Sequence, residues 1–253
     1  MLSLALSLPV PAAMAQPVGE GGGEPATAVT IAGTPATHGE GGAHTSHPVT
    51  GYNHAGGTND ALAVIVSGRP QSGGAQAITV TWNGVAVPER VDTSDIAGLT
   101  ANESFVWVGL LVGAASGVQA LAVGFDKTQS DSVVQLVSLV NVDQAAPVVG
   151  VASSFDEAEA TTVATAGRTG ASTANLFLAG AGIAVGSSLS ALTSGWAEVI
   201  SGKSDAGTST STALLSTVAR APTASGADPL TVTFADSTTR ARALGLVEVK
   251  AAA

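Results

Sequence analysis

The chain has 253 residues, of which 45% are hydrophobic, 4% aromatic and 11% charged, with a net charge of −10. Its nine basic residues are scattered, which excludes a nucleic-acid-binding surface, and the absence of cysteine excludes disulfides and thiol catalysis. Soluble domains carry about 25% charged residues, so a chain with so few would expose an unusually apolar surface as an isolated monomer. We therefore expect the chain to bury surface in a homo-oligomer or larger particle. Insertion into a membrane is not expected, because no run of about 18 apolar residues occurs.

Residues 1–15 form an apolar lead whose Ala13, Met14 and Ala15 fit a signal-peptidase site. A secretory signal begins with basic residues, and here none precedes Arg69. A signal peptide therefore stays an alternative. The preferred interpretation is an apolar segment that docks on a neighbouring subunit or folds under the body.

Residues 16–59 are rich in Gly, Pro, Thr and His and of low complexity. Such a segment buries too little apolar area to offset its ordering entropy. We expect it to be extended or irregular, with a short strand at 28–32. The predicted division is an N-terminal anchoring arm at 1–59 and a β-sandwich domain at 60–253. The expected partner contacts of the arm are Leu4, Leu6, Leu8, Val29, Ile31, His44, His47 and Tyr52.

The body reads as a succession of strands separated by Gly, Asn, Asp and Pro. Asn83 and Gly84 between two β-prone runs predict a hairpin with a type I′ turn. The expected strands are 61–67, 77–81, 85–87, 105–112, 118–125, 132–142, 176–185, 195–201, 211–220, 230–234 and 241–249.

These signals, with no 3.6-residue amphipathic repeat, predict an all-β fold, an antiparallel jelly-roll-like β-sandwich preceded by the extended arm. The long apolar runs predict central strands covered on both faces. No repeat of 20–50 residues is visible, which argues against solenoids and propellers.

All four histidines, His38, His44, His47 and His54, lie in the arm and none in the body. Imidazoles bind Zn²⁺, Ni²⁺ or iron, and carboxylates such as those of Glu40 and Asp60 nearby could complete a ligand set. Their spacing matches no metal signature, and Gly-rich flanks give little support from neighbouring side chains. The favoured interpretation is polar residues of a flexible or docked arm, with no metal and no cofactor.

Other candidates are weaker. Asp156, Glu157 and Glu159 form an acidic cluster that could hold Ca²⁺, but a solvated loop is the favoured interpretation. Glycosidase carboxylates could come from Glu103, Asp126, Glu198 and Asp205, with nothing to single out a pair. No G-x-S-x-G motif occurs. We therefore expect no enzymatic activity.

Three tryptophans remain as large side chains. Trp107 lies within an apolar run and is expected in the core, and Trp196 opens a strand. Packing is the default interpretation for each. Trp82 lies at the predicted hairpin, where an exposed indole could contact a sugar or a partner, so it is the candidate ligand contact.

The order of segments resembles jelly-roll-type sandwich modules in surface proteins of tailed phages and of gene transfer agents. The resemblance rests on residues 60–67, 78–85, 105–111, the turn at Gly117, 120–125, 194–196, 230–234 and 242–249. It is a pattern of strands and turns across most of 60–250. It implies homo-oligomeric display on a particle and, in some members, attachment to cell-surface polysaccharide.

We therefore expect a structural virion protein, such as a head spike base, decoration or fibre-type subunit, on the outer surface of the particle. It would form a pentamer or trimer, contact capsid or other virion proteins through the arm, and touch the host surface with its distal loops. The alternatives are a secreted or cell-surface carbohydrate-binding module and, least favoured, a carboxylate-dependent hydrolase.

Overall fold

The computed structural model describes residues 26–95, 99–101, 103–156, 162–184, 188–204, 213–223, 227–235 and 241–253. These residues form antiparallel strands in three sheets and contain no helix, which confirms the predicted all-β class. In chain order the strands are β1 (Thr30–His54), β2 (Ala61–Pro70), β3 (Ile78–Trp82), β4 (Val85–Ala86), β5 (Glu89–Asp92), β6 (Phe105–Val112), β7 (Gly117–Val140), β8 (Val148–Asp156), β9 (Thr162–Thr169), β10 (Leu176–Ile183), β11 (Leu189–Leu192), β12 (Ala197–Lys203), β13 (Leu214–Arg220), β14 (Ala227–Phe234) and β15 (Arg242–Val249).

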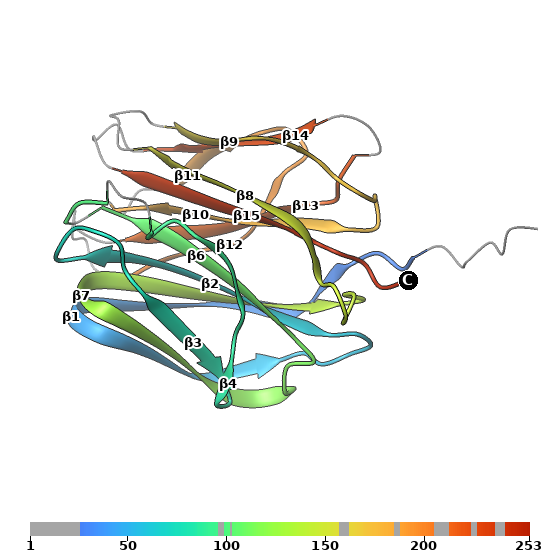
Figure 1. The fold of residues 1–253 in the computed structure, drawn as a ribbon, viewed down its shortest axis with the longest axis horizontal. Helices are drawn as coiled ribbons and strands as arrows, with labels where there is room; N and C mark the ends of the chain where they lie inside the picture. Colours follow the sequence, from blue (N-terminus) through green and yellow to red (C-terminus); the bar gives the residue numbers. More distant parts are fainter. Residues whose placement is uncertain are drawn as a thin grey trace, which may run out of the picture.

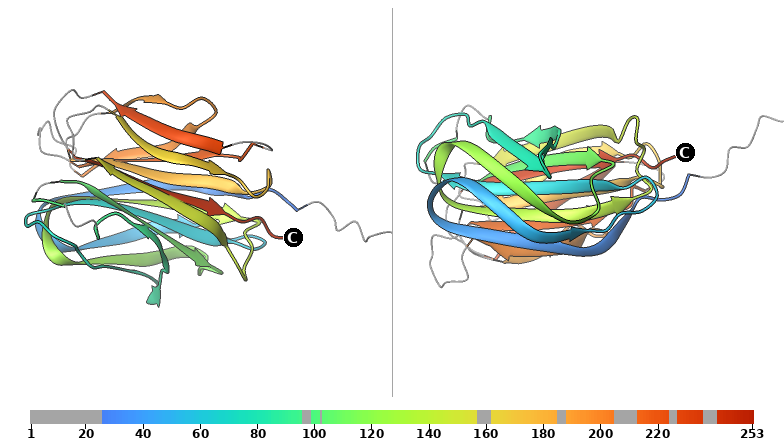
Figure 2. Two further views of the ribbon diagram at one scale, coloured as in Figure 1. Left: turned by 45° about the horizontal axis from the view of Figure 1, so that its top comes forward. Right: turned by 90° about the horizontal axis from the view of Figure 1, so that it is seen from below.

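The first half of the chain, β1 to β7, forms one curled seven-stranded sheet of order β4-β3-β7-β2-β6-β5, with β1 along the other edge of β7. β7 is 24 residues long, and its first part pairs with β3 whereas its second part pairs with β2. β1 follows β7 along nearly its whole length. The long strands β1 and β7 therefore bend together and connect the part of the sheet that contains β3 to the part that contains β2. They are the blue and green strands that curl in Figure 2.

The second half, β8 to β15, repeats this pairing scheme in two separate sheets. β10 lies between β13 and β15, as β2 lies between β6 and β7, and β11 pairs with β14 as β3 pairs with β7. β12 pairs with β13 as β5 pairs with β6. β8 and β9, which pair with β15 and β14, together correspond to β1. The chain is therefore a tandem pair of sandwiches with one strand scheme.

The two halves stack as layers, with the curled sheet at the bottom of Figure 1, the five-stranded sheet β12-β13-β10-β15-β8 in the middle and the three-stranded sheet β11-β14-β9 on top. One apolar core lies inside the curled sheet, one between the halves and one inside the second half. In β2, Ala61, Ala63 and Ile65 face the middle core, and Leu62 and Val64 face the first core. The prediction of strands covered on both faces is thus confirmed.

The contact between the halves requires glycine. A Cβ at Gly180 on β10 would lie 2.5 Å from Cγ2 of Ile65 on β2. Gln135 on β7 also crosses this layer, donating to the carbonyl of Leu215 at 2.9 Å and accepting from the hydroxyl of Thr217 at 2.6 Å. The sheets therefore approach closely where the side chains are small, and the buried amide of Gln135 has hydrogen-bond partners for both its nitrogen and its oxygen.

Several predicted elements are confirmed. The runs at 61–67 and 105–112 are strands, and the turn after Trp82 has positive φ at both Asn83 (47°) and Gly84 (79°), as a type I′ turn needs. The runs at 118–125 and 132–142 belong to one strand, β7, since the polar stretch between them continues the extended backbone. Strands β5, β8, β9 and β11 were not predicted.

The largest difference concerns the arm. Residues 30–54, predicted as extended or irregular with a short strand at 28–32, are one continuous strand, β1, hydrogen-bonded to β7 of the same chain. Glycines at positive φ, such as Gly33, Gly42 and Gly51, permit the bulges that let this sequence follow a bent partner. The boundary expected at residue 59 falls between β1 and β2, which are both strands of the curled sheet.

Candidate functional site

The histidines of β1 face the inside of the curled sheet. His47 and His54 are buried, at 3% and 1% exposure, and His44 is half-buried. Each of these three imidazoles bonds to a serine of β7, with His44 and His47 on Ser132 and His54 on Ser138. Both serines are fully buried on the face of β7 that looks into the first core. The polar side chains of β1 and β7 thus form two hydrogen-bonded clusters within an otherwise apolar layer.

In the first cluster, two imidazoles share one hydroxyl. Nε2 of His44 and Nδ1 of His47 each lie 2.7 Å from Oγ of Ser132. Nδ1 of His44 lies 2.6 Å from the carbonyl oxygen of Gly42, which can only accept, so that nitrogen carries the proton. The hydroxyl of Ser132 bridges the two rings and has one proton, so it can donate to only one of them.

Burial, helped by the positive charges that His44 and His38 could carry, lowers the pKa of His47 to about 4. The carboxylate of Glu40 lies 4.0 Å from Nδ1 of His47 at the edge of the same cluster. Next to it, Arg69 and Asp131 form an ion pair at 2.6 Å, and burial raises the pKa of Asp131 despite this partner. The imidazole of His47 is therefore neutral at ordinary pH and lies beside the carboxyl group of Glu40.

The second cluster is centred on Ser138. Its hydroxyl contacts the hydroxyl of Tyr52 at 2.9 Å and Nδ1 of His54 at 2.8 Å, and accepts from the backbone nitrogen of Ala55 at 3.1 Å. Burial raises the pKa of Tyr52 and lowers the pKa of His54, although Asp60 at 3.8 Å opposes the second shift. Both rings pack edge-on against Trp82. This cluster fixes the end of β1 to β7.

The residues expected to bind a partner contact their own chain in the structure. Val29 is buried in the core between the halves, where its backbone nitrogen donates to the carbonyl of Ala174 at 2.9 Å, and Ile31 packs against that core. His44, His47 and Tyr52 make the serine contacts described above. Leu4, Leu6 and Leu8 lie outside the described residues.

The expectation that Trp82 is exposed and could contact a ligand is wrong. Trp82 is 1% exposed, and its indole nitrogen donates to the carbonyl of Ala115 at 2.9 Å, so it offers no free ring to a sugar. The tight turn that follows points this side chain into the first core and leaves Val85 outside. Trp107 and Trp196 are also buried, as expected for packing residues.

The carboxylate candidates do not assemble a site among the described residues. Glu103 accepts a hydrogen bond from the backbone nitrogen of Thr100, three residues before it in the chain. Asp126 on β7 accepts one from the backbone nitrogen of Ala77, next to β3. Glu157, Glu159 and Asp205 lie outside the described residues, so the acidic cluster with Asp156 is not placed.

The polar positions that organise the cores were not singled out from the sequence. They are Ser132, Ser138, Gln135 and Glu248, all fully buried. Gln135, Ser138 and Glu248 each interrupt an apolar strand run with one hydrogen-bonding side chain, and this is the signal that could have revealed them. Ser132 follows a polar stretch and gives no such signal.

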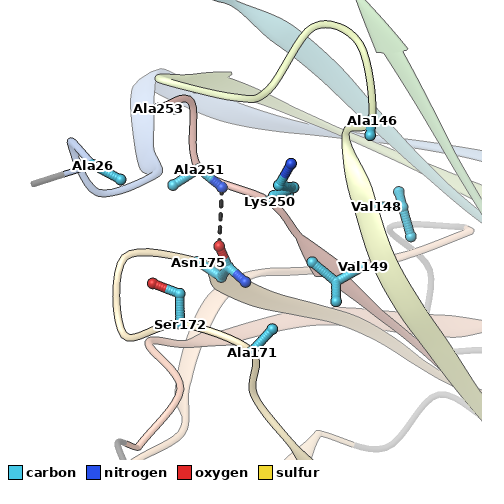
Figure 3. A pocket seen from close by; sticks show the side chains of 10 residues that line it. All are labelled: Ala26, Ala146, Val148, Val149, Ala171, Ser172, Asn175, Lys250, Ala251 and Ala253. Carbon is cyan, nitrogen blue, oxygen red and sulfur yellow. Dashed lines mark hydrogen bonds between the residues drawn. The ribbon is translucent and has the colours of Figure 1, made fainter. Parts of the chain in front are cut away.

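An apolar pocket lies at one end of the molecule, beside the C-terminal residues and the first described residue (Figure 3). A hydrogen bond of 3.0 Å from the backbone nitrogen of Ala251 to the side-chain oxygen of Asn175 closes one wall. Lys250 at the rim forms an ion pair with Asp143 at 2.5 Å. The lining is Ala26, Ala146, Val148, Val149, Ala171, Ser172, Asn175, Lys250, Ala251 and Ala253.

Comparison of the chain with known protein families, with curated proteins and with solved structures finds no match. Within the part of the chain that the structure describes, no helix has the length and hydrophobicity needed to span a membrane. The residues themselves therefore carry the functional argument.

Proposed function

We propose that this chain is a structural protein displayed on the outer surface of a particle such as a phage or a gene transfer agent, and that it acts through surface contacts without catalysis. Its polar clusters support this proposal, because the histidines and serines that come together are bonded to one another inside a core. The strand order of the body, which resembles jelly-roll modules of such particles, supports the choice of particle.

One surface feature carries the proposal. β8 is an edge strand of the five-stranded sheet, and Val149 and Val151 on it are 38% and 45% exposed. Val149 also lines the apolar pocket, and Ala26, where the N-terminal segment enters the described structure, lies in the same lining. Exposed apolar residues on an unpaired edge strand are typical of protein–protein contacts. We propose that this face binds a second copy of the chain, fastened by the apolar lead at 1–15.

The alternative of a secreted or cell-surface carbohydrate-binding module needs a functional signal and either an exposed aromatic ring, for which Trp82 was the candidate, or a Ca²⁺ site. Since that ring is buried, no feature of the described residues favours the alternative, and we do not propose it.

Two measurements test the proposal. Sedimentation of the full chain should show a homo-oligomer, and the double variant Val149→Asp and Val151→Asp should shift it toward the monomer. Val85→Asp with Val118→Asp, which changes two exposed valines of the first half, is the matched control and should leave the oligomer intact. A monomeric parent at tens of micromolar concentration would end the assembly proposal. Mass spectrometry of purified particles from the source organism should find the chain, and its absence from them would end the virion proposal.

A further inference from the structure

Three potential metal ligands converge on the bend of β1. The nearest side-chain ligand atoms of Glu40, His44 and His47 all lie within 4.8 Å of one another. In a regular strand, positions 40 and 47 would face opposite sides. Register shifts between Gly41 and His44 and between His44 and Ser46 turn all three to one side. The bulges of β1 therefore build this grouping, which sequence spacing alone does not show.

The first imidazole is already oriented as metal ligands are. Nδ1 of His44 donates to the carbonyl of Gly42, which leaves the lone pair of Nε2 pointing at the centre of the cluster. In metal sites the non-ligating nitrogen of a histidine almost always makes such a bond, which fixes the tautomer and the ring orientation. The backbone of the bulge thus supplies the support that the Gly-rich sequence was expected to lack.

The second imidazole and the carboxylate complete the donor set. Nδ1 of His47 lies 2.7 Å from Oγ of Ser132, the same atom that His44 contacts, and 4.0 Å from the carboxylate of Glu40. Two imidazole nitrogens and one carboxylate oxygen are a ligand set that Zn²⁺ accepts, with a fourth position left for water. Glu40 and His44 are only half-buried, so an ion can reach the cluster.

We propose that Glu40, His44 through Nε2 and His47 through Nδ1 bind a zinc ion, which takes over the bridging role of the Ser132 hydroxyl. The ion would hold the bend of β1 against β7 by ligands that lie within eight residues of one strand. Its role is structural. This inference goes beyond display on a particle and does not depend on it.

The test uses the full chain without an affinity tag, stripped of metal with a chelator and then titrated with Zn²⁺ at pH 7.5. Calorimetry and elemental analysis after gel filtration should show one zinc per chain, and zinc should raise the melting temperature. Glu40→Gln and His44→Gln should each weaken binding at least tenfold and remove the zinc-dependent rise in melting temperature.

His54→Gln is the matched control, since His54 is a buried histidine of the same strand bonded to the other serine. It should keep one zinc per chain. Glu40 and His44 lie at the edge of the core, so their variants stay folded even where His47→Gln does not. The proposal is overturned where the parent retains no zinc at micromolar free metal, or where His54→Gln weakens binding as much as His44→Gln.

Discussion

The two halves of the molecule share one strand scheme and differ in what they bury. Ala61 pairs with Leu139 in the first half, and Leu176 pairs with Val249 at the corresponding place in the second. The residue before Leu139 is Ser138, and the residue before Val249 is Glu248. Both are buried hydrogen-bond acceptors.

Both acceptors take a backbone N–H from the segment that leads into the next strand. Ser138 takes that of Ala55 and Glu248 that of Ala171. Their other partners differ. Ser138 bonds to the neutral side chains of Tyr52 and His54, whereas Glu248 binds Arg168 at 3.1 Å and Asn175 at 2.7 Å. Both halves therefore have a hydrogen-bond acceptor at this strand position, and the acceptor can be a neutral hydroxyl or a charged carboxylate.

The largest expected effect concerns the tryptophan that anchors each half. Trp82→Ala should lower the free energy of unfolding by about 3–5 kcal/mol, as for other large aromatic side chains removed from a core. Trp196→Ala, in the second half, should cost a similar amount, because its ring stacks on Phe177 at 5.9 Å and its nitrogen bonds to the carbonyl of Pro229. Chemical denaturation measures both. A change below 1 kcal/mol at Trp82 would mean that the ring is not packed as described.

The next largest effect is expected at the two buried acceptors, where removal of Glu248 should lower the free energy of unfolding more than removal of Ser138. Glu248→Ala leaves the half-buried guanidinium of Arg168, an amide and a backbone N–H without their acceptor and should cost about 3 kcal/mol. Ser138→Ala removes a neutral acceptor and should cost about 1–2 kcal/mol. Denaturant unfolding of both variants gives the difference. Equal costs would contradict the distinction between a charged and a neutral cluster.

The first half alone contains histidine, so it should carry the response to mild acid. The pKa of His47 is about 4 when folded and 6.5 when unfolded, so its contribution to stability is present above pH 6.5 and is lost as the pH falls toward 4. Between pH 7 and pH 5 this loss amounts to about 2 kcal/mol. His47→Gln should be correspondingly less sensitive to pH than the parent.

Asp92 changes the stability in the opposite direction as the pH falls, and the comparison of parent and variant must separate its effect from that of His47. Burial raises its pKa to about 6, so its protonation between pH 6 and pH 4 adds stability to the folded state. The difference between parent and His47→Gln cancels this contribution, because both proteins contain Asp92. Identical pH profiles for the two proteins would show that His47 is not buried as a neutral group.

The smallest expected effect concerns the contact between the halves. Gly180→Ala places a methyl group against Ile65 and should cost about 1–2 kcal/mol. Ile65→Ala removes the clashing atom, so the double variant should be more stable than the sum of the two single changes predicts. Strict additivity in a thermal-unfolding cycle would mean that the sheets do not meet at these residues.

The strands with continuous apolar runs, such as β2 and β6, could be predicted from sequence because each is buried on both faces. The sequence of β1 could not reveal a strand of that length. Its inward residues are histidines, a tyrosine and a valine separated by bulges, so the two-residue alternation is lost. The same bulges hid the grouping of Glu40, His44 and His47, and the serines of β7 that bond to the histidines lie more than 80 residues away.

The repetition of the strand scheme also escaped sequence reasoning, because the halves share pairing and not residue types. Ser132 faces Gly68 in one half, and at the corresponding pair Arg242 faces Ile183. A period of more than 100 residues with such substitutions leaves no visible repeat in the sequence.

Hydrogen exchange of the purified chain at low concentration tests the central claim most directly, namely that residues 30–54 complete the first sandwich of their own chain. The amides of β1 that donate to β7 should exchange slowly, with protection that matches their partners on β7. Exchange across 30–54 at the rates of an unstructured chain, alongside a protected β2, would contradict the account.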